Sequence, residues 1–154
     1  MYSVFVHLVN ATRPELADWF GSRAVQGLRE HWYFPNRNDP VFTIRFPREG
    51  AEFKDPEVKR QVSEIMGREP DLSVEFDGGG KHPGHKEMRK FLIELLEEYS
   101  GVAVDDLSPH VWTLEDLKAD KHVNGFAFAD HESFRKQAGA HRDHPAPRPA
   151  SREH

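Results

Sequence analysis

The 154-residue chain contains no cysteine, and none of its hydrophobic runs is long enough to cross a membrane. The absence of thiols excludes disulfides, zinc sites built on thiolates and cysteine nucleophiles. The first apolar stretch, residues 4–9, is short and contains His7, so neither a signal peptide nor a transmembrane span is predicted. We therefore expect a cytoplasmic protein that depends on an ordinary hydrophobic core.

Common catalytic signatures are missing as well. Neither a Gly-x-Ser-x-Gly nucleophile elbow nor a His-Glu-x-x-His metal motif occurs. The segment 77–85 reads Asp-Gly-Gly-Gly-Lys-His-Pro-Gly-His, whereas a Walker loop would place Ser or Thr and then a helix directly after the lysine. The sequence therefore predicts a protein that is not an enzyme and has no cofactor.

The chain is acidic, and its charge is unevenly distributed. It has 26 acidic and 21 basic residues. Positions 135–154 hold five basic and two acidic residues, which leaves a net charge of about −8 on positions 1–134. Residues 139–154 have three prolines, three histidines and no large apolar side chain. We expect one globular domain at 1–138, a disordered tail at 139–154, and no binding of nucleic acid by the acidic body.

Hydrophobic periodicity predicts strands at residues 2–9, 41–46 and 72–77. Thr12, with Glu15 three residues later, predicts a helix whose apolar spacing continues to Trp32. The sequence also predicts a helix between Asp55 and Gly67, and a long helix with an apolar stripe from Met88 to Tyr99. Shorter elements are expected at 113–117, 123–129 and 130–137.

These elements favour an α+β fold. One face of each predicted strand is apolar, and the other carries Ser, Thr, Arg or Glu. We therefore expect a two-layer sandwich in which a small sheet, mostly antiparallel or mixed, carries helices on one face. The strand order stays open.

Acidic residues are concentrated in one part of the chain. Between Lys90 and Lys118 there is no lysine or arginine, and there are seven acidic residues. We predict that this segment binds a basic protein partner, with Trp112 and Tyr99 as aromatic anchors, although a solvated face and core aromatics fit the same pattern. The predicted partner-binding residues are Glu94, Glu97, Glu98, Asp105, Asp106, Trp112, Glu115 and Asp116.

The histidines near the glycine-rich loop support an alternative hypothesis. Asp77, His82, His85 and His110 have the side chains that a metal- or anion-dependent enzyme would need. The loop fits a flexible connection equally well, and the histidines fit ordinary surface positions. The first hypothesis includes no metal site, and this alternative uses His82, His85 and His110.

The second half of the domain resembles small immunity proteins of bacterial polymorphic toxin systems. The resemblance lies in the segment 72–96 with its glycine-histidine loop, in His-Val-Trp-Thr-Leu-Glu-Asp-Leu at 110–117 and in Gly-Phe-Ala-Phe at 125–128. It implies a cytosolic α+β protein that binds and blocks a cognate toxin domain, often a nuclease. No membrane partner is expected, and the oligomeric state stays open, as does a regulatory binding domain without a toxin partner.

Overall fold

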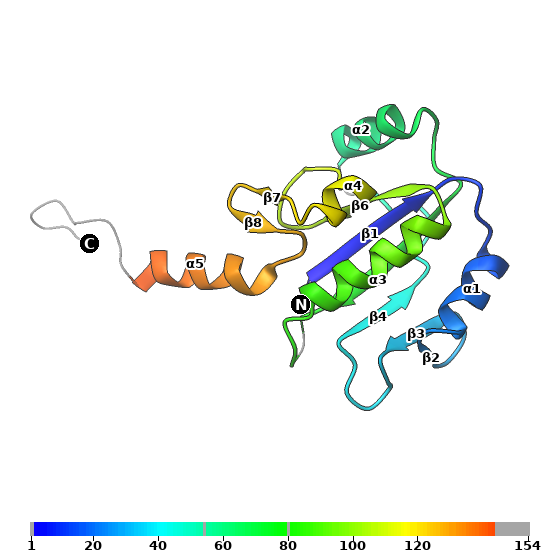
Figure 1. Ribbon diagram of the computed structural model, residues 1–154, viewed down its shortest axis with the longest axis horizontal. Coiled ribbons are helices and arrows are strands. Elements are labelled where there is room, and N and C mark those ends of the chain that lie inside the picture. The colour runs from blue at the N-terminus through cyan, green and yellow to red at the C-terminus, as the bar shows by residue number, and fades with distance from the viewer. Residues whose placement is uncertain (1, 54, 80, 144–154) are drawn as a thin grey trace, which may run out of the picture.

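The computed structural model describes residues 2–53, 55–79 and 81–143. Its main sheet has six strands in the order β2-β3-β4-β5-β1-β6, and every neighbouring pair is antiparallel (Figure 1). A separate hairpin follows the sheet. The strands are β1 (Tyr2–Leu8), β2 (Val25–Gln26), β3 (His31–Phe34), β4 (Phe42–Arg45), β5 (Leu72–Gly78), β6 (Gly101–Asp105), β7 (His122–Val123) and β8 (Phe126–Ala127).

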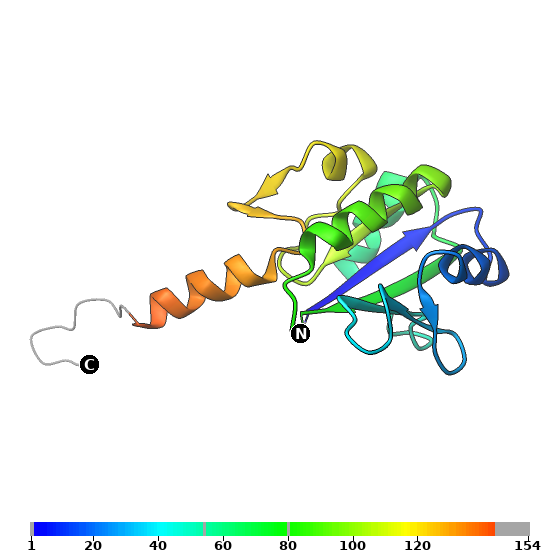
Figure 2. The same ribbon diagram turned by 60° about the horizontal axis from the view of Figure 1, so that its bottom comes forward.

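Five helices complete the described part of the chain, and the α+β class expected from the sequence is confirmed. They are α1 (Arg13–Gly21), α2 (Pro56–Met66), α3 (His85–Glu98), α4 (Leu114–Lys118) and α5 (His131–Asp143). The path β1-α1-β4-β5-α3-β6 has the connectivity of a split βαβ fold. The hairpin strands β2 and β3 and the helix α2 are additions to it, and α5 projects away from the body (Figure 2).

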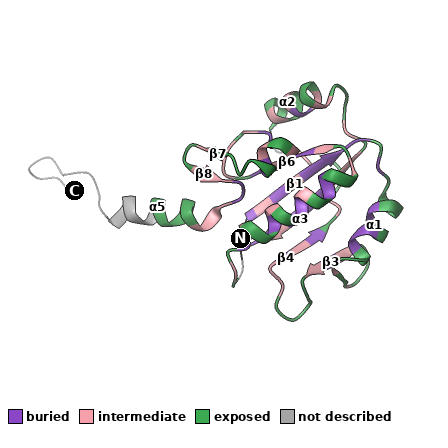
Figure 3. Ribbon diagram, in the orientation of Figure 1, coloured by how far each residue is buried: buried purple, intermediate pink, exposed green. Residues whose placement is uncertain are grey.

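Alternation along β1 separates the two faces of the sheet. Tyr2, Val4, Val6 and Leu8 are at most 1% exposed and pack with apolar residues of α1 and α3. Figure 3 shows the buried residues gathered along β1, α1 and α3. On the opposite face α2 packs against β6. Val62 of α2 and Val102 of β6 belong to a second apolar cluster there. The expected helix layer therefore lies on the first face, and α2 is added on the second.

Several local signals act as the sequence predicts. The Thr12 and Glu15 side chains form a reciprocal capping box at the start of α1, and Thr113 with Asp116 does the same at α4. These pairs satisfy backbone amides that have no partner inside the helix. Gly67 ends α2 in the left-handed conformation, with a φ of 76°.

The structure differs from the prediction most clearly at the first helix, at β6 and at the last helix. The first helix ends at Gly21 and not at Trp32, which pairs with Ile44 in the sheet. The strand β6 was not predicted, because its five residues show little alternation. The last helix continues to Asp143, past the start of the tail expected at 139–154. Residues 144–154 of that tail lie outside the described residues.

Aromatic rings fill the centre of the layer between the sheet and the helices. The ring of Phe91 on α3 lies 5.2 Å from that of Phe42 and 5.8 Å from that of Phe76, centroid to centroid. It also contacts the rings of Trp19, Phe20 and Phe34. Phe91 therefore connects α1, α3 and the sheet.

We predict that Phe91→Ala lowers the free energy of unfolding by about 3 to 5 kcal/mol, because it opens a cavity where these elements meet. Urea denaturation measures the change. The control is Leu28→Ala, at a side chain that is 78% exposed, with an expected change within about 0.5 kcal/mol. Equal effects of the two substitutions would contradict the central position of Phe91.

Candidate functional site

The predicted partner-binding residues do not form one surface. Two of them, Asp105 and Trp112, are only 5% and 1% exposed. Two others are on the side of α3 that faces α1, and three lie near α4. Asp106 lines a pocket on the second face of the sheet, where α2 lies. The α1 group is Glu94 and Glu98, and the α4 group is Glu97, Glu115 and Asp116.

The placement of Trp112 and Asp105 on a binding surface is corrected by their burial. Trp112 forms an isolated bridge with Ala103 and packs edge-on against Phe128 at 5.4 Å. The Asp105 carboxylate accepts hydrogen bonds from the backbone N–H groups of Ala129, at 2.9 Å, and Leu107, at 3.3 Å. Burial raises the pKa of Asp105. Both residues join the end of β6 to the segment before α5, so their role is structural.

Carboxylates of α1 and α3 meet around Tyr99. Burial raises the pKa of Tyr99, and the negative charges of Glu15, Glu98 and Asp18 raise it further. On the same side Glu94 lies 3.8 Å from Arg23, the basic residue that opposes this effect. We call this surface the α1–α3 acidic face, and it comprises Glu15, Asp18, Glu94 and Glu98. Sequence reasoning missed Glu15 and Asp18, because only the fold brings α1 beside α3.

The acidic residues near α4 are largely paired. Glu97 lies 3.2 Å from Lys118, and Asp116 lies 3.0 Å from His110 and 3.8 Å from Lys121. Asp116 also caps α4, and although burial opposes it, hydrogen bonds from Thr113 and His110 lower the pKa of its carboxyl. Exposed ion pairs cancel much of each other's field, so the negative charges of Glu97 and Asp116 are partly neutralised by their neighbours.

The four residues of the alternative hypothesis lie beside different side chains. Asp77 accepts a hydrogen bond from Ser3, and His82 lies 2.9 Å from Asp39. His85 lies 3.6 Å from Asp130, and His110 is bound to Asp116. Among the described residues, no group of three or more His, Asp or Glu side chains is arranged to hold a metal ion.

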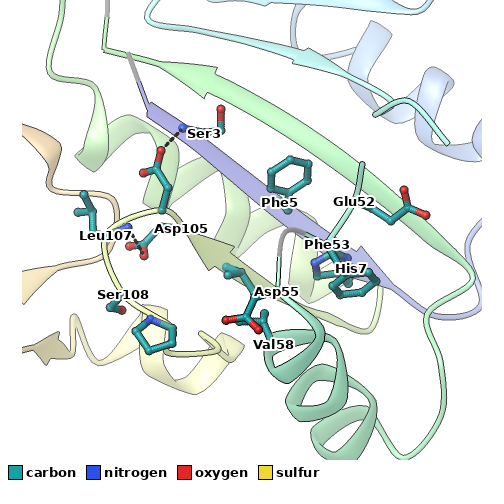
Figure 4. A pocket seen from close by; sticks show the side chains of 13 residues that line it. Ser3, Phe5, His7, Glu52, Phe53, Asp55, Val58, Asp105, Leu107 and Ser108 are labelled. Carbon is teal, nitrogen blue, oxygen red and sulfur yellow. Dashed lines mark hydrogen bonds between the residues drawn. The ribbon is translucent and has the colours of Figure 1, made fainter. Parts of the chain in front are cut away.

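A pocket of about 560 Å³ opens on the second face of the sheet, where α2 and the loop after β6 enclose β1 (Figure 4). Phe5 and His7 of β1 form its floor, and Phe53 covers His7. Carboxylates lie around it. The acidic lining residues are Glu52, Asp55, Asp105 and Asp106.

Two carboxylates of β5 lie on the same face, beyond Ser3. Arg45 lies 2.8 Å from Glu75 and 3.4 Å from Asp77, and the Ser3 hydroxyl donates to Asp77 at 2.7 Å. Burial, with the neighbouring Glu75 charge, raises the pKa of Asp77 from 3.8 to about 6. Burial lowers the pKa of His7 from 6.5 to about 4, so this imidazole is neutral at pH 7.

No family model, curated protein or solved structure matches the chain. A function therefore has to be argued from the residues and their geometry. The helices of the described residues are all too short or too polar to cross a bilayer.

Asp77 gives a prediction about stability and pH. Its carboxyl holds a proton more tightly in the folded state than in the unfolded state, so its contribution to stability is present at low pH and is lost as the pH rises from about 4 to about 6. Neutral His7 has the opposite effect, because its contribution is lost as the pH falls from 6.5 to about 4. The two effects overlap, so a variant must separate them.

We predict that Asp77→Asn gains stability relative to the wild type, by about 1 to 2 kcal/mol, as the pH rises from 4 to 7. His7 is present in both proteins, so its contribution cancels. Urea denaturation at a series of pH values gives the difference. Asp18→Asn, which removes an exposed carboxylate from α1, is the control, and an identical pH trend for the two variants would refute the assignment.

Proposed function

We propose that this chain is an immunity protein, which binds a cognate bacterial toxin domain in the cytoplasm and blocks it. In this proposal the toxin domain is basic and cuts nucleic acid. The α1–α3 acidic face makes the contact, with the half-exposed Tyr99 as its aromatic anchor. The resemblance within residues 72–128 supports the class of protein, and the charge of the folded body supports a basic partner.

The observation that carries the proposal is the meeting of three carboxylates, from α1 and α3, around one tyrosine, with Glu94 beside Arg23 on the same side. A nuclease needs a basic surface to bind phosphates, so an acidic face is complementary to it. Tyrosine is among the residues that contribute most to binding energy, because it offers a large rigid area with a polar tip. Such a face favours fast association and excludes acidic partners.

The arrangement of the residues in the alternative enzyme hypothesis also favours a binding protein over an enzyme. The aspartate and two of the histidines of the alternative enzyme are hydrogen bonded to separate side chains, and His85 lies 3.6 Å from a fourth, so the four residues do not converge on one reacting atom. Nucleophile, base and stabilising donor would have to meet within hydrogen-bonding distance for catalysis. We therefore propose that the chain acts by occupying a surface of its partner.

The test uses the protein encoded by the adjacent upstream gene as the partner. We expect the wild type to form a tight one-to-one complex with it and to restore growth when both are expressed together. Asp18→Lys combined with Glu98→Lys should slow association by roughly tenfold or more at low salt, because it reverses two charges beside Tyr99. Stopped-flow measurements of association give the rate.

The matched control is Glu49→Lys combined with Glu69→Lys, which makes the same change in charge at a different surface pocket. Its association rate should stay close to that of the wild type. Equal slowing by the two double variants would show that net charge acts, and not this face. The absence of both a complex and rescue by the wild type would overturn the immunity proposal and favour a binding domain without a toxin partner.

A further inference from the structure

The pocket on the second face of the sheet lies away from the α1–α3 acidic face, because side chains that alternate along β1 point to opposite sides. Its lining combines flat rings with carboxylates. It contains Phe5, Val58, Val104 and Leu107 as apolar walls, and among the described residues that line it there is no lysine or arginine. An apolar pocket with an acidic rim is unusual on a surface that needs only to be soluble.

Three rings form a nearly parallel series in this pocket. The rings of Phe5 and His7 are inclined by 7° at a centroid distance of 6.5 Å, and those of His7 and Phe53 by 12° at 4.3 Å. Flat, parallel π surfaces favour a planar cation that can lie against a ring. A tetrahedral ammonium group makes less contact with such a surface, because it cannot stack on a ring.

The carboxylates of the rim supply negative charge and acceptors. Asp106 accepts a hydrogen bond from the backbone N–H of Ser3 at 3.1 Å through Oδ2, and Asp55 accepts one from the backbone N–H of Glu57 through Oδ1. No hydrogen bond from a described residue reaches the carboxylate of Glu52. Each of these carboxylates has an oxygen available to a further donor. The Asp105 carboxylate, in contrast, accepts hydrogen bonds from two backbone amides and forms part of the pocket wall.

His7 adds a polar atom to the floor of the pocket. The residue is 1% exposed, and its Nδ1 lies 2.8 Å from the Ser73 hydroxyl. Its other ring nitrogen, Nε2, has no hydrogen-bond partner among the described residues. When Nδ1 carries the proton and donates to Ser73, Nε2 is an acceptor. Because His7 lines the pocket, this acceptor favours a ligand that brings an N–H group.

We propose that this pocket binds an arginine side chain presented by a basic partner protein. The guanidinium stacks on the rings of Phe5 and Phe53, its N–H groups donate to Glu52, Asp106 and His7 Nε2, and its methylene groups lie along Val58 and Val104. Arginine fits better than lysine, because it is planar and has five donors in a fixed arrangement. One described cation on this side, Lys59, lies 6.0 Å from the Phe53 ring, lines the neighbouring pocket and is near Glu69.

This inference goes beyond the proposed function, because the pocket and the α1–α3 acidic face are separate sites. It depends on the immunity proposal only for the identity of the partner that carries the arginine. A toxin that binds elsewhere would leave the pocket unaffected, and a loss of pocket binding would leave the acidic face in place. The experiment therefore uses a small probe and no toxin.

The probe is N-acetyl-arginine amide, titrated into the full chain labelled with ¹⁵N at physiological salt. We expect saturable chemical-shift changes that cluster at Phe5, His7, Phe53 and Asp106, with a Kd on the order of 1 mM for a single side chain. The matched probes are N-acetyl-citrulline amide, which has the same shape without the charge, and N-acetyl-lysine amide. Citrulline should bind at least roughly fivefold more weakly and lysine roughly threefold more weakly.

Two variants test the proposed contacts. Glu52→Gln keeps the size of the side chain and removes a rim charge, and Phe53→Leu keeps an apolar wall and removes the ring. Each should weaken binding of the arginine probe roughly threefold or more. Glu115→Gln, an exposed charge on α4, is the control and should leave the Kd unchanged. The ¹⁵N spectrum of each variant also reports whether it is folded.

The result that would overturn the proposal is equal binding of the arginine and citrulline probes, or shift changes spread over the acidic surface without saturation. Arginine binding that Glu52→Gln and Glu115→Gln weaken equally would also overturn it, because general charge would then explain the affinity. If binding follows the expected pattern but no toxin complex forms, the pocket stands and the immunity proposal fails.

Discussion

The pairing of β1 on both sides, between β5 and the edge strand β6, is the constraint on which the rest of the structure depends. It is paired with β5 from Tyr2 to Leu8 and with β6 from Val4 to Leu8, so its register is fixed from both sides over most of its length. A shift by one residue would place Ser3, Phe5 and His7 under α3 and expose the core set. β6 approaches β1 closely at Gly101, where any side chain would collide with the carbonyl group of His7. One strand thus determines which residues form the core and which line the pocket.

The elements that the sequence predicts well are those with a strong local cause. Capping by Thr12, Asp55 and Thr113 is decided within four residues, and the alternation of β1 needs no information from elsewhere. The helix that was expected to reach Trp32 fails for the opposite reason. Apolar residues after Gly21 keep helical spacing, but Trp32 is buried as a strand residue beside Ile44, and Leu28 is left exposed. The local sequence allows both a helical and a strand periodicity here, and strand pairing in the folded protein decides between them.

The candidate sites show the same division. Exposure of Glu94, Glu97 and Glu98 follows from the apolar stripe of α3 and was predictable, but burial of Asp105 was not, because its strand has no alternating pattern. Counting acidic residues along the chain joined groups that the fold separates, and it overlooked Glu15 and Asp18. The pocket is built from β1, the segment 52–58 that leads into α2, and the end of β6 with the loop after it, three segments that are far apart in sequence. No single segment of the sequence contains its signal.

The two proposed sites act on a partner at different distances, and this separates their physical effects. The α1–α3 acidic face works through a field that extends about 8 Å at physiological salt, so it influences the approach of a basic protein before contact. The pocket is effective only after contact, because stacking on Phe53 and donation to Glu52 need a guanidinium already inside it. Salt should therefore act mainly on the association rate through the acidic face, whereas substitutions in the pocket should act mainly on dissociation. A chain with both features can attract basic surfaces in general and retain those that present an arginine at the right place.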